Sequence, residues 1–275
     1  MTAAAPPNHA EGLLRARFAS IGGRTRVLDL REAGGYRMRF PKVPAGPSSA
    51  YEAVCINTGG GMVGGDRLGL DFACGPGAAL TLTTQSAEKM YGSAGATTQV
   101  STALDVEAGG RLDWLPQETI LFDRARFART LDVRLAPDAT FLALEALVFG
   151  RLAMGETMRT GLVRDRWRVQ RGGRLVFAED LRLEGPVEAL LDRPALGGGA
   201  RAFATLLLVA SDAEARLEPL RAALAPLGEG VDWGASAWNG LLSWRAAAVS
   251  PERLRRSIVA ALDHLRGQPA PRVWQ

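Results

Sequence analysis

A strand–turn–strand pattern recurs along the first two thirds of the chain, and it limits the folds available more than any other feature. Alternating apolar and polar residues flank a glycine or proline turn in each copy. The copies span residues 70–80, 104–114, 131–142 and 167–177. Their turns centre near residues 76, 110, 138 and 173, so they repeat about every 28 to 35 residues. Units of this size cannot bury a face alone, so the pattern predicts a mostly β, elongated, β-helix-like stack of short strands. An ordinary β-sandwich built from similar hairpins is the alternative.

Two α-helices are expected near the C-terminus. Ser250 and Pro251 are typical of a helix start, apolar residues follow at helical spacing, and Gly267 ends the run. A second helix is expected to begin near Asp212, with Pro219 kinking or dividing it. We expect one domain over residues 1–275, with residues 1–11 disordered and the tail after Gly267 extended.

Composition predicts a cytoplasmic protein with neither a membrane span nor a nucleic-acid site. No apolar run approaches 18 residues, and the N-terminus lacks the pattern of an export signal. The two cysteines do not make a disulfide framework. The 33 basic residues, all arginine except Lys42 and Lys89, alternate with 29 acidic ones and form no basic block.

Glycine occupies five of the seven positions from Gly59 to Gly65, and Asp66 follows directly. Such a segment adopts positive φ angles or lets another group approach the backbone closely. The Lys-Ser/Thr ending of a phosphate-binding loop is missing, and residues 68–72 look like a strand rather than a helix. A nucleotide site is therefore not expected here.

Carboxylates are the candidate functional groups, because no histidine and cysteine spacing matches a tight metal site. Glu145 lies in an apolar stretch, where a carboxylate must be paired or protonated. It is either a structural partner of an arginine, such as Arg151, or a functional acid. Glu179 and Asp180 are adjacent, so only one of them faces the interior of a sheet.

Several stretches resemble the UreD (also UreH) family of urease accessory proteins. They are Asn-Thr-Gly-Gly-Gly-Met-Val-Gly-Gly-Asp at 57–66, Thr-Thr-Gln-Ser-Ala-Glu-Lys-Met-Tyr at 83–91, Leu-Pro-Gln-Glu-Thr-Ile-Leu-Phe-Asp at 115–123, Phe-Gly-Arg-Leu-Ala-Met-Gly-Glu at 149–156 and Pro-Arg-Val-Trp at 271–274. Their order and spacing cover roughly residues 36 to 275. Thr58 stands where many members of the family have proline.

The resemblance implies a urease maturation chaperone that is not an enzyme and holds no tightly bound cofactor. Such a scaffold binds apo-urease and UreF and, through UreF, the GTPase UreG, and it helps deliver nickel to the urease active site. The residues expected to line a transient nickel passage are Asp66, Glu179, Glu145 and Ser86. The residues expected to contact partners are Trp274, Arg272, Leu254 and Ile258.

Two other functions fit the residues without the resemblance. A carbohydrate-active hydrolase or lyase on a β-solenoid would use a pair of inward-facing carboxylates. A β-rich interaction module would need neither metal nor catalysis.

Overall fold

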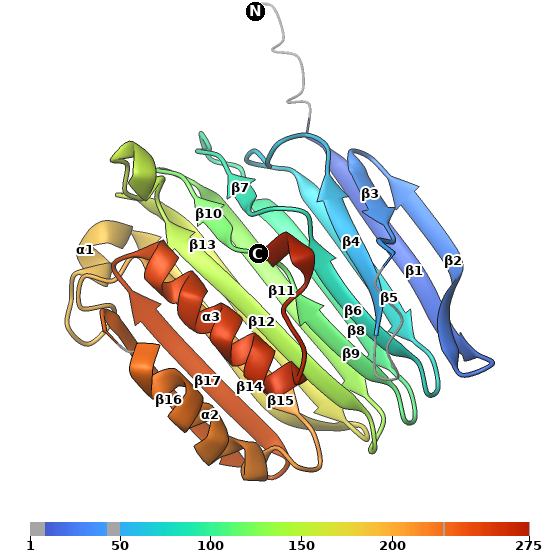
Figure 1. Cartoon of the computed structure of the whole chain (residues 1–275). Coiled ribbons are helices and arrows are strands. Elements are labelled where there is room, and N and C mark those ends of the chain that lie inside the picture. Colours follow the sequence, from blue (N-terminus) through green and yellow to red (C-terminus); the bar gives the residue numbers. More distant parts are fainter. Residues whose placement is uncertain (1–8, 43–49, 228, 275) are drawn as a thin grey trace, which may run out of the picture.

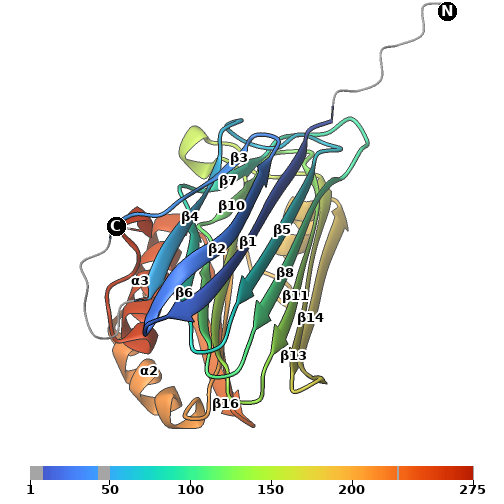
Figure 2. The same ribbon diagram turned by 90° about the vertical axis from the view of Figure 1, so that its right-hand side faces the viewer.

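Two β-sheets face each other, and helices cover the outer face of one sheet (Figures 1 and 2). The computed structural model describes residues 9–42, 50–227 and 229–274. Sheet A has the spatial order β14 (Arg174–Gly185), β13 (Gly161–Arg171), β11 (Arg126–Leu135), β8 (Thr98–Val106), β5 (Arg67–Cys74), β1 (Glu11–Ile21) and β2 (Arg24–Ala33). The expected disorder of residues 1–11 lies, up to residue 8, outside the described residues, and Glu11 already begins a strand.

Sheet B faces sheet A and is larger. Its order is β16 (Val231–Trp238), β17 (Leu241–Ala248), β15 (Ala202–Val209), β12 (Thr140–Phe149), β9 (Arg111–Leu115), β6 (Ala79–Thr84), β4 (Tyr51–Asn57) and β3 (Tyr36–Arg39), while β10 (Thr119–Leu121) pairs with β12 and with β7 (Glu88–Met90). The helices are α1 (Val187–Leu191), α2 (Leu217–Leu224) and α3 (Pro251–Arg266), and the 3₁₀ turns are η1 (Leu152–Met154), η2 (Glu214–Arg216), η3 (Ala225–Leu227) and η4 (Arg272–Trp274).

The predicted β-helix-like stack is confirmed. Strands β5, β8 and β11 pair in parallel in sheet A, and each leads through a turn into sheet B, where β6, β9 and β12 also stack in parallel. The turns stack as well: the Gly77 amide donates to the Ala108 carbonyl at 2.9 Å. The Gly109 amide donates to the Asp138 carboxylate at 3.0 Å. Each of the first three sequence repeats is thus a corner between the two sheets, and the two strands of a repeat do not pair with each other.

The fourth repeat differs from the other three. Gly172 and Gly173 both have positive φ angles, 56° and 77°, which suit a tight two-residue hairpin turn. The chain therefore stays in sheet A, and β13 pairs with β14 antiparallel. This hairpin ends the parallel stack.

Helix α3 has the predicted ends. The Ser250 hydroxyl accepts the Arg253 amide at 3.2 Å, and Gly267 closes the helix in the left-handed conformation. Helix α2 begins at Leu217 rather than near Asp212. Pro219 consequently lies in the first turn, where its missing amide costs no hydrogen bond, so the predicted kink is wrong.

Two apolar cores result from this arrangement. The first lies between the sheets and includes Leu14, Phe72, Leu104 and Leu131. The second lies between the outer face of sheet B and helices α2 and α3. Among the described residues, no helix is both long enough and apolar enough to cross a membrane.

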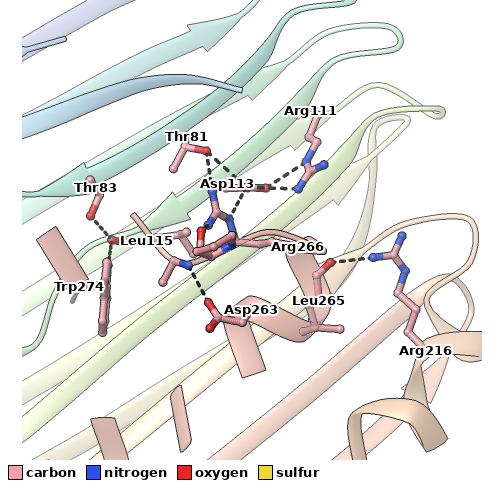
Figure 3. A network of polar contacts seen from close by, with 12 residues as sticks. Thr81, Thr83, Arg111, Asp113, Leu115, Arg216, Asp263, Leu265, Arg266 and Trp274 are labelled. Carbon is pink, nitrogen blue, oxygen red and sulfur yellow. Dashed lines mark hydrogen bonds and ion pairs between the residues drawn. The ribbon is translucent and has the colours of Figure 1, made fainter. Parts of the chain in front are cut away.

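Two arginines of α3, Arg266 and the partly buried Arg255, attach the helix to sheet B and to the segment before β10. Figure 3 shows Arg266, whose Nε donates to Asp113 Oδ2 on β9 at 3.0 Å. Both side chains are nearly inaccessible, at 4% and 1% exposure. The Arg255 guanidinium binds both Glu118 oxygens at 2.8 Å and lies 4.8 Å from the Trp274 ring centre. The helix is therefore fixed by charge as well as by apolar contact.

The C-terminal tail and α3 do not form the exposed partner surface that was expected from the sequence. Trp274 is 2% exposed, and its indole Nε1 donates to the Leu115 carbonyl at 3.1 Å. Leu254 and Ile258 are buried in the second core. The tail is folded onto the chain rather than extended, because the indole fills an apolar site and finds a hydrogen-bond acceptor there. Of the four residues expected to contact partners, only Arg272 is exposed.

Replacing Arg266 by alanine should lower the free energy of unfolding by about 3 kcal/mol, because it leaves the Asp113 carboxylate buried beside only one arginine, Arg111. Urea unfolding of the purified chain measures the loss. Arg256→Ala, an exposed position on the same helix, serves as the control and should change stability by less than about 0.5 kcal/mol. Equal losses in both variants would contradict a buried ion pair as the attachment.

Candidate functional site

The glycine segment connects β4 to β5 and packs against β7 and the residues that follow it. The Met62 amide donates to the Lys89 carbonyl at 2.8 Å, and the Tyr91 amide donates back to Met62 at 2.9 Å. A Cβ atom on Gly61 would lie 2.8 Å from the Lys89 carbonyl oxygen, and one on Gly64 would lie 2.7 Å from a carbonyl of the next loop. The group that approaches this backbone so closely is therefore another part of the same chain.

Asp66 closes the glycine segment as an internal cap. Its carboxylate accepts the Val63 amide and the Ala10 amide, each at 2.8 Å, and the residue is 5% exposed. These bonds join the start of β5 to the chain just before β1. The first role of Asp66 is thus to hold the loop, a role that the sequence alone did not indicate.

Behind the glycine segment lies a cavity of about 100 Å³ with several polar groups in its lining. The Glu88 carboxylate accepts the Asn57 side-chain amide at 2.9 Å, and burial raises the pKa of Glu88. The Tyr36 hydroxyl is buried without a hydrogen-bond partner among the described residues, and burial raises its pKa as well. Ser86 lines the cavity from an exposed position.

Glu145 on β12 lies in the core beside an arginine. Its carboxylate accepts the Trp114 indole N–H at 2.9 Å and forms an ion pair with Arg129 of β11. Arg129 also donates through Nε to Asp165 of β13 at 3.1 Å. The structural partner of Glu145 is thus Arg129, whereas Arg151 pairs with Glu156.

Charge is unbalanced in this buried cluster, since one guanidinium faces two carboxylates. Burial raises the pKa of Glu145 to about 7, against the lowering effect of Arg129. Burial lowers the pKa of Arg129, but the charges of Asp165 and Glu145 outweigh it and raise that pKa further above its usual value. Arg129 therefore stays charged, whereas Glu145 has a pKa near neutral pH and is readily protonated.

Glu179 on β14 faces inward, as one of the adjacent acidic pair must, and Asp180 faces outward to Arg164. Glu179 pairs with Arg245 of β17 at 2.8 Å, and burial raises its pKa although Arg245 opposes this. Its side chain lines both a surface groove of about 460 Å³ and a smaller cavity of about 40 Å³. Glu145 and Asp165 line the same small cavity.

The structure therefore brings together two of the four residues that were expected to line a nickel passage. Glu145 and Glu179 share one cavity, whereas Ser86 lines the other and Asp66 caps the loop beside it. The two cavities have no lining residue in common. Sequence reasoning missed Arg129 and Asp165, although each is a charged residue at an inward-facing position of its strand, where alternation places apolar side chains. Among the described residues, no group of three histidine, cysteine or acidic side chains could hold a metal ion.

Glu145 should make stability depend on pH. Because its pKa is about 7 in the folded chain and 4.5 when unperturbed, the folded chain binds more protons between these values. The free energy of unfolding should therefore fall as the pH rises through this window, and Glu145→Gln should remove part of that fall. Urea unfolding at several pH values tests this, with the surface variant Glu218→Gln as control. A slope unchanged by Glu145→Gln would contradict the raised pKa.

Comparisons with known proteins agree over almost the whole chain. The sequence model for the UreD urease accessory protein family matches residues 10–275. A protein of Azorhizobium caulinodans named urease accessory protein UreD is 49% identical over 274 residues, covering 100% of this chain and 99% of its own length. Proteins of the same name from Xanthobacter autotrophicus and Rhizobium leguminosarum are 51% and 46% identical, covering 96% and 100% of this chain and 89% and 98% of their own. The chain belongs to the UreD family of urease accessory proteins.

Proposed function

We propose that this chain is a cytoplasmic scaffold that binds apo-urease and UreF and, through UreF, the GTPase UreG, and that it helps nickel reach the urease active site. Membership of the UreD family supports the general role in urease maturation. The scaffold itself catalyses no reaction in this proposal. Nickel is its cargo and is held only in transit.

The observation that carries the nickel proposal is the shared cavity of Glu145 and Glu179 between the sheets. These acids come from β12 and β14, and Glu179 also lines the larger groove that opens at the side of the stack. Carboxylate oxygens bind nickel less tightly than imidazole or thiolate groups. Such a lining would let a cation enter and leave without being trapped.

Arg129 must move, or share its acids, if a cation is to pass the cluster. Its guanidinium forms ion pairs with both Glu145 and Asp165, whose carboxylate oxygens would otherwise be the ligands of a divalent ion. Two carboxylates against one guanidinium leave a negative excess that favours an additional positive charge. In the proposal, docking of apo-urease or UreF shifts Arg129 and joins the cavity at Glu145 with the cavity at Glu88.

The alternative of a carbohydrate-active enzyme gains no support from this geometry. The cavity that Glu145 and Glu179 share has only about 40 Å³, and each of these acids is paired with an arginine. A glycosidase needs an open cleft with one carboxylic acid free to donate its proton.

Glu179→Ala should lower the nickel content and the activity of urease matured in cells several-fold, because it removes the acid between the groove and the inner cavity. Nickel per urease subunit, measured by mass spectrometry, is the readout. Binding of UreF and apo-urease should be retained, which separates a lost route from a lost assembly. The single variant is preferred to one that also changes Asp66, because Asp66 holds the glycine segment.

Asp180→Ala is the matched control, since the neighbouring carboxylate points away from the cavity and pairs with Arg164 on the outer face. Its urease should carry as much nickel as the wild type. Full nickel loading with Glu179→Ala would exclude this acid from the route. Loss of partner binding in that variant would instead point to a structural effect.

A further inference from the structure

A cavity of about 680 Å³ lies apart from the acids between the sheets and is lined by charged residues. Two of the sequence stretches identified above, 115–123 and 149–156, supply much of its lining. Phe122 and Asp123 come from the first stretch, and Arg151 and Glu156 from the second. Arg124 and Arg159 complete its charged groups, so three guanidinium groups face two carboxylates.

Both carboxylates are already occupied. Asp123 Oδ1 accepts the backbone amides of Arg159 and Thr160 at 2.9 and 3.1 Å, and Oδ2 accepts the Arg159 guanidinium at 2.8 Å. Although desolvation opposes it, these bonds hold the pKa of Asp123 below its usual value. Glu156 accepts the Asp123 amide at 3.0 Å and the Arg151 Nε at 2.7 Å. The two acids therefore neutralise Arg159 and Arg151.

Arg124 is the cation left over. Among the described residues its guanidinium has no hydrogen bond or ion pair, and the residue is exposed. Its backbone adopts a left-handed conformation with φ of 64°, and its amide donates a hydrogen bond to the Thr160 carbonyl at 2.9 Å. Non-glycine residues rarely adopt this conformation, and when they do they cluster at binding sites. The turn thus presents an unpaired positive charge at this cavity.

An apolar slot of about 240 Å³ adjoins this cavity, since Arg151 lines both. Most of its lining is apolar and includes Ile120, Val148, Leu152 and Pro251, the last at the start of α3. Two acids, Glu118 and Glu252, also line it, and Glu118 is paired with Arg255. Met154, in the same turn as Leu152, is 76% exposed. A free inorganic anion would leave this apolar surface uncovered, whereas a protein segment would cover both features at once.

We propose that this face docks a segment of a partner protein in which a carboxylate side chain is close to an apolar one. The carboxylate pairs with the Arg124 guanidinium, and the apolar side chain fills the slot beside Arg151. The proposal rests on the proposed function in one respect: the partner is UreF or apo-urease. It goes beyond that function by assigning the docking surface and the chemistry it recognises.

The test measures binding of the full chain to UreF and to apo-urease of the same organism by biolayer interferometry, at low and high salt. Arg124→Glu should weaken binding to one of them by about tenfold or more, and the salt dependence should largely disappear. Ala153→Glu places a carboxylate at an exposed position of the slot and should weaken the same partner. Arg24→Glu, the same charge change at the start of β2, should bind normally.

Arg124 and Ala153 are exposed, so both variants should keep the melting temperature of the wild type, which verifies folding. Normal binding of both partners by Arg124→Glu would overturn the docking proposal alone. Inorganic phosphate binding that Arg124→Glu abolishes, with partner affinity unchanged, would also overturn it by making the cavity a small-anion site. Failure of the wild type to bind either partner would contradict the proposed function together with the docking surface.

Discussion

Parallel backbone pairing between successive strand–corner–strand units is the constraint on which the structure depends. Strands β5, β8 and β11 hydrogen-bond only across units, as do β6, β9 and β12, so no unit satisfies its own backbone groups. The same pairing fixes which side chains face the space between the sheets, because a shift of one residue would turn every apolar side chain outward. The interior is thereby assembled from residues distant in sequence.

Charges inside this apolar interior are stable only when they are paired. Arg129 of β11 binds Asp165 of the neighbouring strand β13 and Glu145 of β12 in the other sheet, and Arg245 binds Glu179 at the open side. A buried carboxylate without such a partner would protonate or destabilise the fold. Acids that lie along the proposed cation route are therefore also structural acids, and their substitution affects both roles.

The strong preference for arginine over lysine has a structural explanation. Arginine binds planar acceptors through several donors at once, which suits buried attachments. Arg266 holds α3 to Asp113, and Arg255 binds Glu118 while stacking on Trp274. Because each of these arginines is balanced by a carboxylate, the net charge of +4 comes from arginines such as Arg124 and Arg256, which form no ion pair among the described residues.

Local patterns in the sequence determined the β-rich stack, its turns and the capped helix from Pro251 to Arg266, because alternation, glycine turns and helix caps depend on neighbouring residues. The sequence also indicated that Glu145 needs a partner and that only one of Glu179 and Asp180 faces inward. Only the tertiary structure decided that Arg129 is the partner of Glu145, that Asp66 caps the glycine segment, and that Trp274 is buried. These outcomes depend on strand register and helix docking, which bring together residues whose separation in sequence carries no signal.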